Sequence, residues 1–265
     1  MSGRDVDMND AKLREVLITL ANRYPDELIR DQVRDVVRIH SNIQLVLHGL
    51  AKPPETIEIC DLGGGIGLFS VGCAAYGMKR TVLVDDFEDP INHAVGSTIL
   101  DLHRGYGVDV VSRDVIRSGL KDLEGRFDII TSFDSMEHWH HSPKQLFCEV
   151  VEKLKPGGIF CLGVPNCVNL RKRLTVPLGF GKWSSMQDWY ETKVFRGHVR
   201  EADVSDLRYI VRDMGLAEVR LVGRNWLGYF SGNGLIRVTA RLFDYPLRFR
   251  PQLCSDIYVL GRKPL

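Results

Sequence analysis

The sequence predicts an α/β fold in which a mostly parallel sheet carries helices on both faces. Short apolar segments alternate with amphipathic segments between residues 56 and 164, and a glycine-rich loop follows the first apolar segment. Alternating strands and helices give parallel sheets because each crossover helix returns the chain to the same edge. The length, 265 residues, suits one such domain with additions.

Seven segments have the composition of strands: residues 56–61, 81–85, 108–112, 127–133, 159–164, 218–223 and 256–261. Polar caps and prolines mark helix starts between them, at Asp89-Pro90, Ser142-Pro143 and Asp203. Residues 226–252 are aromatic and basic, and no element is assigned there.

Residues 1–54 are predicted to form a helical extension. Leu13, Val16, Leu17 and Leu20 recur at helical spacing, and Pro25 stands where a second helix can begin. Residues 55–265 then form the main domain. Within it, residues 165–200 have no clean period and are expected to form a lid or substrate-binding insertion.

Composition excludes several classes of protein. The net charge of +1 gives no general attraction for nucleic acid or an anionic membrane. No apolar run is long enough for a membrane span, and the polar first ten residues are not a signal peptide. The six cysteines form no C-x-x-C pair and are interpreted as reduced thiols, so we expect a cytoplasmic protein.

The segment Asp61-Leu62-Gly63-Gly64-Gly65-Ile66-Gly67 is the first candidate binding site. Glycines let a backbone approach a ligand closely, and the following helix offers free N–H groups. Asp61 could accept a hydrogen bond from an ammonium group. A dinucleotide site would have a similar loop, although Ser70 stands where that pattern has its third glycine.

Acidic residues follow the next two predicted strands. Asp85, with Asp86 after it, is placed to bind ribose hydroxyls at the end of the second strand. Asp114, followed by Val115, could accept from the exocyclic amine of adenine, but an ordinary polar turn has the same composition.

Two later motifs identify the ligand. The segment from Phe127 to Glu137-His138, together with Leu154-Lys155-Pro156-Gly157-Gly158, resembles the class I S-adenosylmethionine-dependent methyltransferases. The resemblance implies a Rossmann-like seven-stranded sheet whose antiparallel last strand, 256–261, lies beside 218–223. It also implies S-adenosylmethionine as cofactor.

The resemblance also assigns positions around that cofactor. Asp61, Gly63, Gly64, Gly65 and Gly67 would line the methionine part. Asp85 and Asp86 would lie at the ribose, Asp114 and Val115 at the adenine, and Phe133, Asp134 and Ser135 on the open side. Gly64 departs from many relatives, which have Cys or Ala, and this departure is expected to be harmless.

Three residues are candidates for catalysis: Glu137, His138 and His198. Methyl transfer to a hydroxyl usually needs a general base, and histidine is the commonest. Asp134-x-x-Glu137-His138 is similar to a cluster in ubiquinone-biosynthesis O-methyltransferases that can bind a divalent metal. The interpretation preferred here is a loop fixed by hydrogen bonds, without a metal.

The acceptor is expected to be a small molecule bound by the lid, which contains Trp183, Trp189, Tyr190 and the run Arg171-Lys172-Arg173. That run is interpreted as a solvated helix face. Parts of the lid resemble bacterial methyltransferases of glycan and secondary-metabolite pathways, which favours a hydroxyl acceptor. An N-methyltransferase, a catalytically inactive binding module and an NAD(P)-dependent oxidoreductase remain alternatives.

Overall fold

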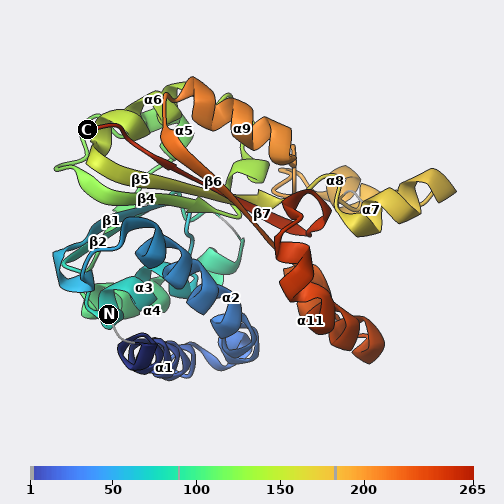
Figure 1. The fold of residues 1–265 in the computed structure, drawn as a ribbon, viewed down its shortest axis with the longest axis horizontal. Helices are drawn as coiled ribbons and strands as arrows, with labels where there is room; N and C mark the ends of the chain where they lie inside the picture. Colours follow the sequence, from blue (N-terminus) through green and yellow to red (C-terminus); the bar gives the residue numbers. More distant parts are fainter. Residues whose placement is uncertain (1–2, 89, 182–183) are drawn as a thin grey trace.

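The computed structural model describes residues 3–88, 90–181 and 184–265 (Figure 1). Asp89, a predicted helix cap, and Trp183, a predicted lid residue, lie outside the described residues. The seven strands are β1 (Glu58–Leu62), β2 (Arg80–Asp85), β3 (Val108–Ser112), β4 (Phe127–Phe133), β5 (Leu154–Pro165), β6 (Ala217–Arg224) and β7 (Asp256–Arg262).

These strands form one sheet in the order β3-β2-β1-β4-β5-β7-β6. The pairs from β3 to β5 are parallel, and β7 pairs antiparallel with both β5 and β6. The predicted sheet, with its antiparallel last strand inserted beside the sixth, is therefore confirmed. The strand order reverses between β1 and β4, which is where open α/β sheets bind ligands.

Helices cover both faces of the sheet, as predicted (Figure 1). On one face lie α1 (Gly3–Ala21), α2 (Asp26–Leu50), α3 (Leu68–Tyr76) and α4 (Pro90–Gly105), and on the other α5 (Val115–Ser118), α6 (Lys144–Lys153) and α9 (Val204–Asp213). Short 3-10 turns are η1 (Pro54–Thr56), η2 (Met136–His138), η3 (Val176–Leu178) and η4 (Pro251–Leu253).

Local sequence signals explain the ends of α9. The Asp203 side chain accepts from the backbone of Ser205 and Asp206, and Asp206 accepts in return from the Asp203 backbone. Gly215 follows with a φ of +68°, which ends the helix. The helix that returns the chain to the sheet after the lid thus starts and stops where the sequence predicts.

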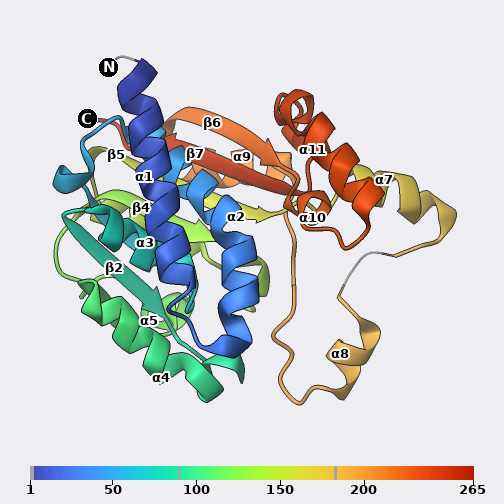
Figure 2. The ribbon, with the colours of Figure 1, turned by 90° about the horizontal axis from the view of Figure 1, so that it is seen from below.

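Four further helices project from the sheet (Figure 2). The lid contains α7 (Leu170–Thr175) and α8 (Met186–Glu191). The unassigned aromatic and basic stretch forms α10 (Trp226–Tyr229) and α11 (Gly234–Arg248). Among the described residues, no helix combines the length and apolarity that crossing a membrane requires.

The N-terminal helices are part of the core. Leu13, Leu17 and Leu20 of α1 are almost fully buried, in one cluster with Leu68 and Val71 of α3. A Cβ atom at Gly72 would lie 2.6 Å from Leu17 Cδ2, so the two helices are in close contact. The division at residue 54 remains a prediction about sequence organisation.

This packing makes Leu17 a sensitive position. Leu17→Ala is expected to lower the free energy of unfolding by about 2–5 kcal/mol, because Leu17 is fully buried and its truncation leaves a cavity in the core. The neighbouring Ile18 is 42% exposed, so Ile18→Ala is expected to cost less than about 1 kcal/mol. Urea denaturation of both variants measures the difference, and equal losses would contradict a buried α1.

Candidate active site

The glycine loop leaves the sheet at the end of β1. Gly63 has a φ of +71° and donates its N–H to the carbonyl of Val84, at 2.8 Å. Gly65 has a φ of +55° and donates to Asp85 Oδ2, at 2.9 Å. Both angles favour glycine. The predicted loop residues therefore lie against the end of β2, and the Asp85 carboxylate holds them there.

Asp61 is buried beneath this loop. Its side-chain oxygens accept from Ser70 Oγ at 2.7 Å and from Thr131 Oγ1 at 2.8 Å. Burial raises the pKa of Asp61 to about 6, although these hydrogen bonds oppose the shift. The oxygens are directed at α3 and β4, so the ammonium contact expected of Asp61 stays a prediction.

Gly64 lies in close contact with the Asp61 side chain. A Cβ atom at position 64 would lie 2.0 Å from Asp61 Oδ2 and 2.9 Å from Leu83 Cδ1. Asp61 is held by two hydrogen bonds and cannot move aside freely. Glycine at position 64 therefore leaves room for this position of the Asp61 side chain, and the expectation that the departure is harmless stays a prediction.

The other predicted cofactor residues lie along the same edge of the sheet. Asp86 forms an ion pair of 3.4 Å with Arg196, which connects the end of β2 to the lid. Asp114 caps α5 by accepting from the backbone N–H of Ile116 and of Arg117, at 2.9 and 3.1 Å. Val115 is buried. The cap is a structural role for Asp114, and contact with adenine remains a prediction.

The end of β4 lies directly beside the glycine loop. A Cβ atom at Gly63 would meet Ser135 Oγ at 1.9 Å, so the two segments are as close as the absence of a side chain allows. Asp134 has a φ of +50°, which is strained for a residue other than glycine. The Phe133 ring packs edge-on against Phe69, with centroids 5.0 Å apart. The structure thus brings together Gly63, Phe133, Asp134 and Ser135, and their predicted contact with the cofactor stays a prediction.

Asp134 is paired with a residue that the sequence did not single out. Arg38 of α2 donates to Asp134 Oδ2 at 2.6 Å and to Asp35 at 2.7 Å. Burial raises the pKa of Asp134, and the charge of Arg38 opposes that shift. Because Arg38 belongs to the N-terminal helices, these helices contribute directly to the candidate site.

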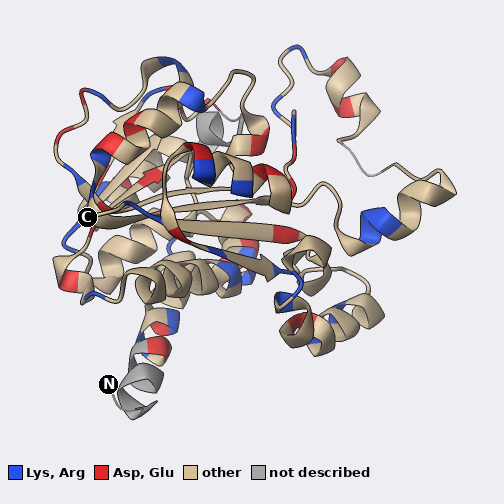
Figure 3. Ribbon diagram, turned by 45° about the horizontal axis from the view of Figure 1, so that its top comes forward, with Lys and Arg blue, Asp and Glu red and all other residues tan. Residues whose placement is uncertain are grey.

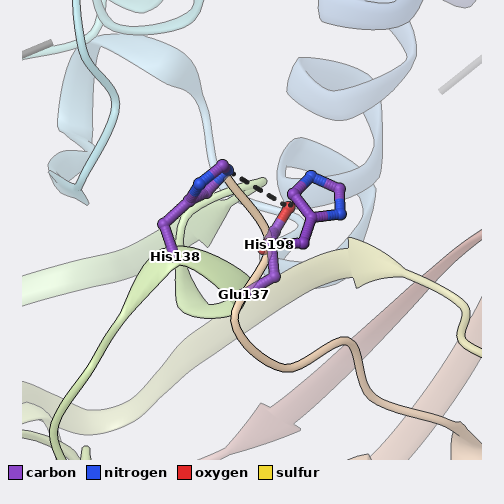
Figure 4. Close-up of side chains that lie close together, drawn as sticks. All are labelled: Glu137, His138 and His198. Carbon is purple, nitrogen blue, oxygen red and sulfur yellow. Dashed lines mark ion pairs between the residues drawn. The ribbon is translucent and has the colours of Figure 1, made fainter. Parts of the chain in front are cut away.

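Glu137, His138 and His198 converge next to this pair (Figure 4). Glu137 Oε1 lies 4.0 Å from His138 Nε2 and 3.9 Å from His198 Nε2, and the two rings are edge to face at 4.9 Å. Glu137 is 1% exposed, and its Oε2 has no hydrogen-bond partner among the described residues. Burial raises the pKa of Glu137 to about 8, helped by the nearby charge of Asp134.

The Nδ1 atoms of both imidazoles form hydrogen bonds within the protein. His138 Nδ1 lies 2.6 Å from the carbonyl of Arg196, and His198 Nδ1 lies 2.9 Å from Glu201 Oε1. Both partners are acceptors, so each Nδ1 carries a proton and each Nε2 of a neutral ring presents a lone pair toward Glu137. The hydrogen bond that His198 donates to Glu201 raises the pKa of His198, whereas burial lowers the pKa of His138.

Glu201 is held in turn by Lys172. The ammonium group of Lys172 forms an ion pair with Glu201 Oε2, and the lysine is 7% exposed. The interpretation of Arg171-Lys172-Arg173 as a solvated face is therefore wrong for Lys172. Its neighbours Arg171 and Arg173 are exposed, as predicted.

The cluster has the composition of a metal site, with one ligand atom from each of Glu137, His138 and His198 within 4.8 Å of the others. Two imidazole nitrogens and a carboxylate suit a divalent transition metal. Asp134, the first acid of the metal motif, is instead paired with Arg38. A metal at this cluster would therefore be held by Glu137, His138 and His198, and Asp134 would not be a ligand.

A cavity of about 1380 Å³ opens from this cluster. Its lining includes Asp134, Glu137, His138 and His198 as well as residues of α10 and α11. The glycine loop and Asp85 are not among the lining residues. The cavity therefore does not include the predicted cofactor-binding loop. It adjoins the predicted cofactor site at Asp134, which lines the cavity.

Sequence reasoning missed Arg38, Lys172 and Glu201. Arg38 follows Arg30 and Arg34 at helical spacing and cannot be distinguished from a surface arginine by sequence. Glu201 stands three residues after His198, and this spacing was the available signal.

Comparison with known families identifies the fold. A profile of the family described as "Methyltransferase domain" matches residues 34–221, well over half of the chain. The chain belongs to this family. The predicted enzyme class, a methyltransferase, is thereby confirmed, and the match begins inside α2 rather than at residue 55. Comparison with curated protein sequences gave no significant match.

Solved methyltransferases share the fold at low sequence identity. An S-adenosylmethionine-dependent methyltransferase from Archaeoglobus fulgidus is 18% identical over 87% of this chain and 94% of its own, with a TM-score of 0.51. Magnesium protoporphyrin IX methyltransferase from Synechocystis PCC 6803, with bound S-adenosylhomocysteine, is 14% identical over 88% and 86%, with a TM-score of 0.53. Phosphoethanolamine N-methyltransferase 2 from Haemonchus contortus, in complex with S-adenosylmethionine, is 15% identical over 85% of this chain and 53% of its own, with a TM-score of 0.52.

The buried carboxyl of Glu137 makes a pH-dependent prediction. Its pKa is about 8 in the fold and about 4.3 in an unfolded chain, so the folded protein retains a proton that the unfolded chain releases between these values. Stability is therefore lost as the pH rises from 5 to 8. Glu137→Gln removes this loss, and its free energy of unfolding should exceed that of the wild type by on the order of 3 kcal/mol at pH 8.

Glu149→Gln is the matched control. Burial raises the pKa of Glu149, but hydrogen bonds from Gln145 and Leu120 outweigh burial and the pKa is lowered. The Gln variant should therefore be less stable than the wild type at pH 8. Urea denaturation at pH 5 and 8 compares the two variants, and a Glu137→Gln variant that is less stable than the wild type at pH 8 would contradict the raised pKa of Glu137.

Proposed function

We propose that this protein transfers the methyl group of S-adenosylmethionine to a hydroxyl of a small molecule, such as a sugar-containing or other hydroxylated metabolite. The main support for this proposal is that Glu137, His138 and His198 converge beside Asp134, where the cavity adjoins the predicted cofactor site. The family match and the cofactors bound in the solved relatives support the donor.

The cofactor is proposed to lie across the carboxyl ends of β1, β2 and β4. Gly63, Gly64, Gly65 and Gly67, with Asp61 beneath them, would follow the methionine part. Asp85 and Asp86 would bind the ribose, and Asp114 with Val115 the adenine. Phe133, Asp134 and Ser135 would separate the sulfonium from the cavity.

His198 is proposed as the general base. Its Nδ1 proton is directed at Glu201, which leaves the Nε2 lone pair free to take a proton from the acceptor hydroxyl. The oxygen then forms a bond to the methyl carbon as the carbon–sulfur bond breaks, and the electron pair stays on sulfur as the thioether. His138 and the neutral carboxyl of Glu137 would position the hydroxyl.

Binding of the cofactor tests the donor. Calorimetry should show that S-adenosylmethionine and S-adenosylhomocysteine bind and NADH does not. Asp85→Ala should weaken both by at least about tenfold, because the loss of one charged hydrogen-bond partner costs about 1.5–3 kcal/mol. Asp109 on β3 is an exposed ion-pair partner of Arg80, and Asp109→Ala should leave the affinity for both adenosyl compounds unchanged. Folded wild-type protein that binds neither adenosyl compound would overturn the proposal.

The pKa of His198 tests the proposed base without knowledge of the acceptor. Glu201→Gln should lower this pKa, because the carboxylate that favours the imidazolium is gone. NMR titration measures it, with His198→Ala to assign the resonance and Glu218→Gln, an exposed partner of Arg262, as control. An unchanged pKa in Glu201→Gln would remove Glu201 from the site.

Activity measurements then separate the alternatives. With tritiated methyl donor, the acid limb of the pH profile should move to lower pH in Glu201→Gln, because the base is deprotonated at lower pH. Turnover that is unaffected by EDTA is expected for the hydrogen-bonded cluster, and loss of turnover would assign the cluster to a metal. Methylation of amines alone would identify an N-methyltransferase.

A further inference from the structure

The cavity beside the candidate active site is polar at one end and apolar at the other. Asp134, Glu137, His138 and His198 form the polar end. The far wall contains Ile236, Ala240, Phe243 and Leu247 of α11. These four positions are spaced by four, three and four residues, so they form one stripe along the helix.

The rest of the chain covers the apolar stripe only in part, since Ala240 and Leu247 are half-buried. None of the 15 residues of α11, all of which lie in the described part of the chain, is buried. Ile236 is 50% and Phe243 is 59% exposed. Large apolar side chains left exposed along one face usually mark a binding surface.

The dimensions indicate what could cover this stripe. From Ile236 to Leu247 a helix rises by about 16 Å. The cavity volume of about 1380 Å³ exceeds the roughly 300–1,000 Å³ of ordinary small-molecule pockets. Because the cavity continues to Glu137 and His198, one ligand can reach both ends.

We propose that the acceptor is an amphiphile, whose hydroxylated head lies at Glu137 and His198 and whose apolar chain lies along the α11 stripe. This inference rests on the proposed function and specifies its substrate class. Leu170 of α7 and Phe230, after α10, would close over the chain from the lid side and from the α10 side.

The occupant is a ligand chain rather than a second protein because the stripe lines the same cavity as Glu137 and His198. Leu235 and Leu242, on the same helix, are 74% and 70% exposed but do not line the cavity. A partner protein or a lipid surface would cover these outward residues. An apolar chain bound in the cavity would contact Phe243 and leave Leu242 in solvent.

Alkyl maltosides test the inference, since each has a hydroxyl-rich head and an apolar chain. Calorimetry below the critical micelle concentration compares maltose, octyl maltoside and dodecyl maltoside. Affinity should rise with chain length, by up to about fourfold for each methylene. Maltose that binds as tightly as dodecyl maltoside, or no binding of either alkyl compound, would overturn the proposal.

Phe243→Ser and Leu242→Ser locate the chain. Phe243→Ser should weaken dodecyl maltoside binding by at least about tenfold, and Leu242→Ser should bind like the wild type. Equal losses in both variants, a loss in Leu242→Ser alone, or a dimer that either variant dissociates in sedimentation velocity would show another occupant on α11 and overturn the proposal. S-Adenosylhomocysteine binding should be unchanged in both variants. Because wild-type binding of that compound tests the proposed function separately, the two failures are distinguishable.

Discussion

The buried carboxyl of Asp61 joins the three elements on which the site depends. It lies one residue before the end of β1, accepts from Ser70 on α3, and accepts from Thr131 on β4. A buried carboxyl with two such partners fixes the spacing of its neighbours, because any movement leaves a polar group unsatisfied. The Asp61 side chain also occupies the space where a side chain at position 64 would lie, so the loop can pass this close to Asp61 only with glycine there. The ends of β1 and β4, and with them Gly63 and Ser135, are held together by this contact.

The charges near the end of β4 form two groups of ion pairs. Arg38 pairs with Asp134, and Lys172 and His198 both pair with Glu201. Glu137 has an oxygen, Oε2, without a hydrogen-bond partner among the described residues, and burial raises the pKa of this carboxyl to about 8. A buried oxygen without a partner is unfavourable for stability, and perturbed groups of this kind are common at functional sites. Basic and acidic residues are interspersed along the rest of the chain (Figure 3).

The lid connects the cofactor side to the acceptor side. Arg196 pairs with Asp86 at the end of β2. Shortly after it, the backbone N–H groups of Val199 and Arg200 donate to the carbonyl of Glu137. The same short segment thus contacts both proposed ligand sites and carries His198. On the opposite side of the cavity, α11 supplies an apolar wall that the mostly polar site near β4 lacks. This division is what the proposed amphiphilic acceptor would require.

The sequence by itself determined the strands and helices of a mostly parallel sheet and the location of the glycine loop. These features follow from local signals, namely apolar periodicity, helix caps and a run of glycines. The place of the antiparallel last strand came from the resemblance to a known family. The partners of the site were decided by tertiary structure alone. Arg38 meets Asp134 across 96 residues and Lys172 meets Glu201 across 29, and no local pattern distinguishes such residues from surface charges. The contribution of α11 to the cavity could not be predicted from the sequence either. The sequence of an amphipathic helix shows which face is apolar, but not which part of the protein that face lies against.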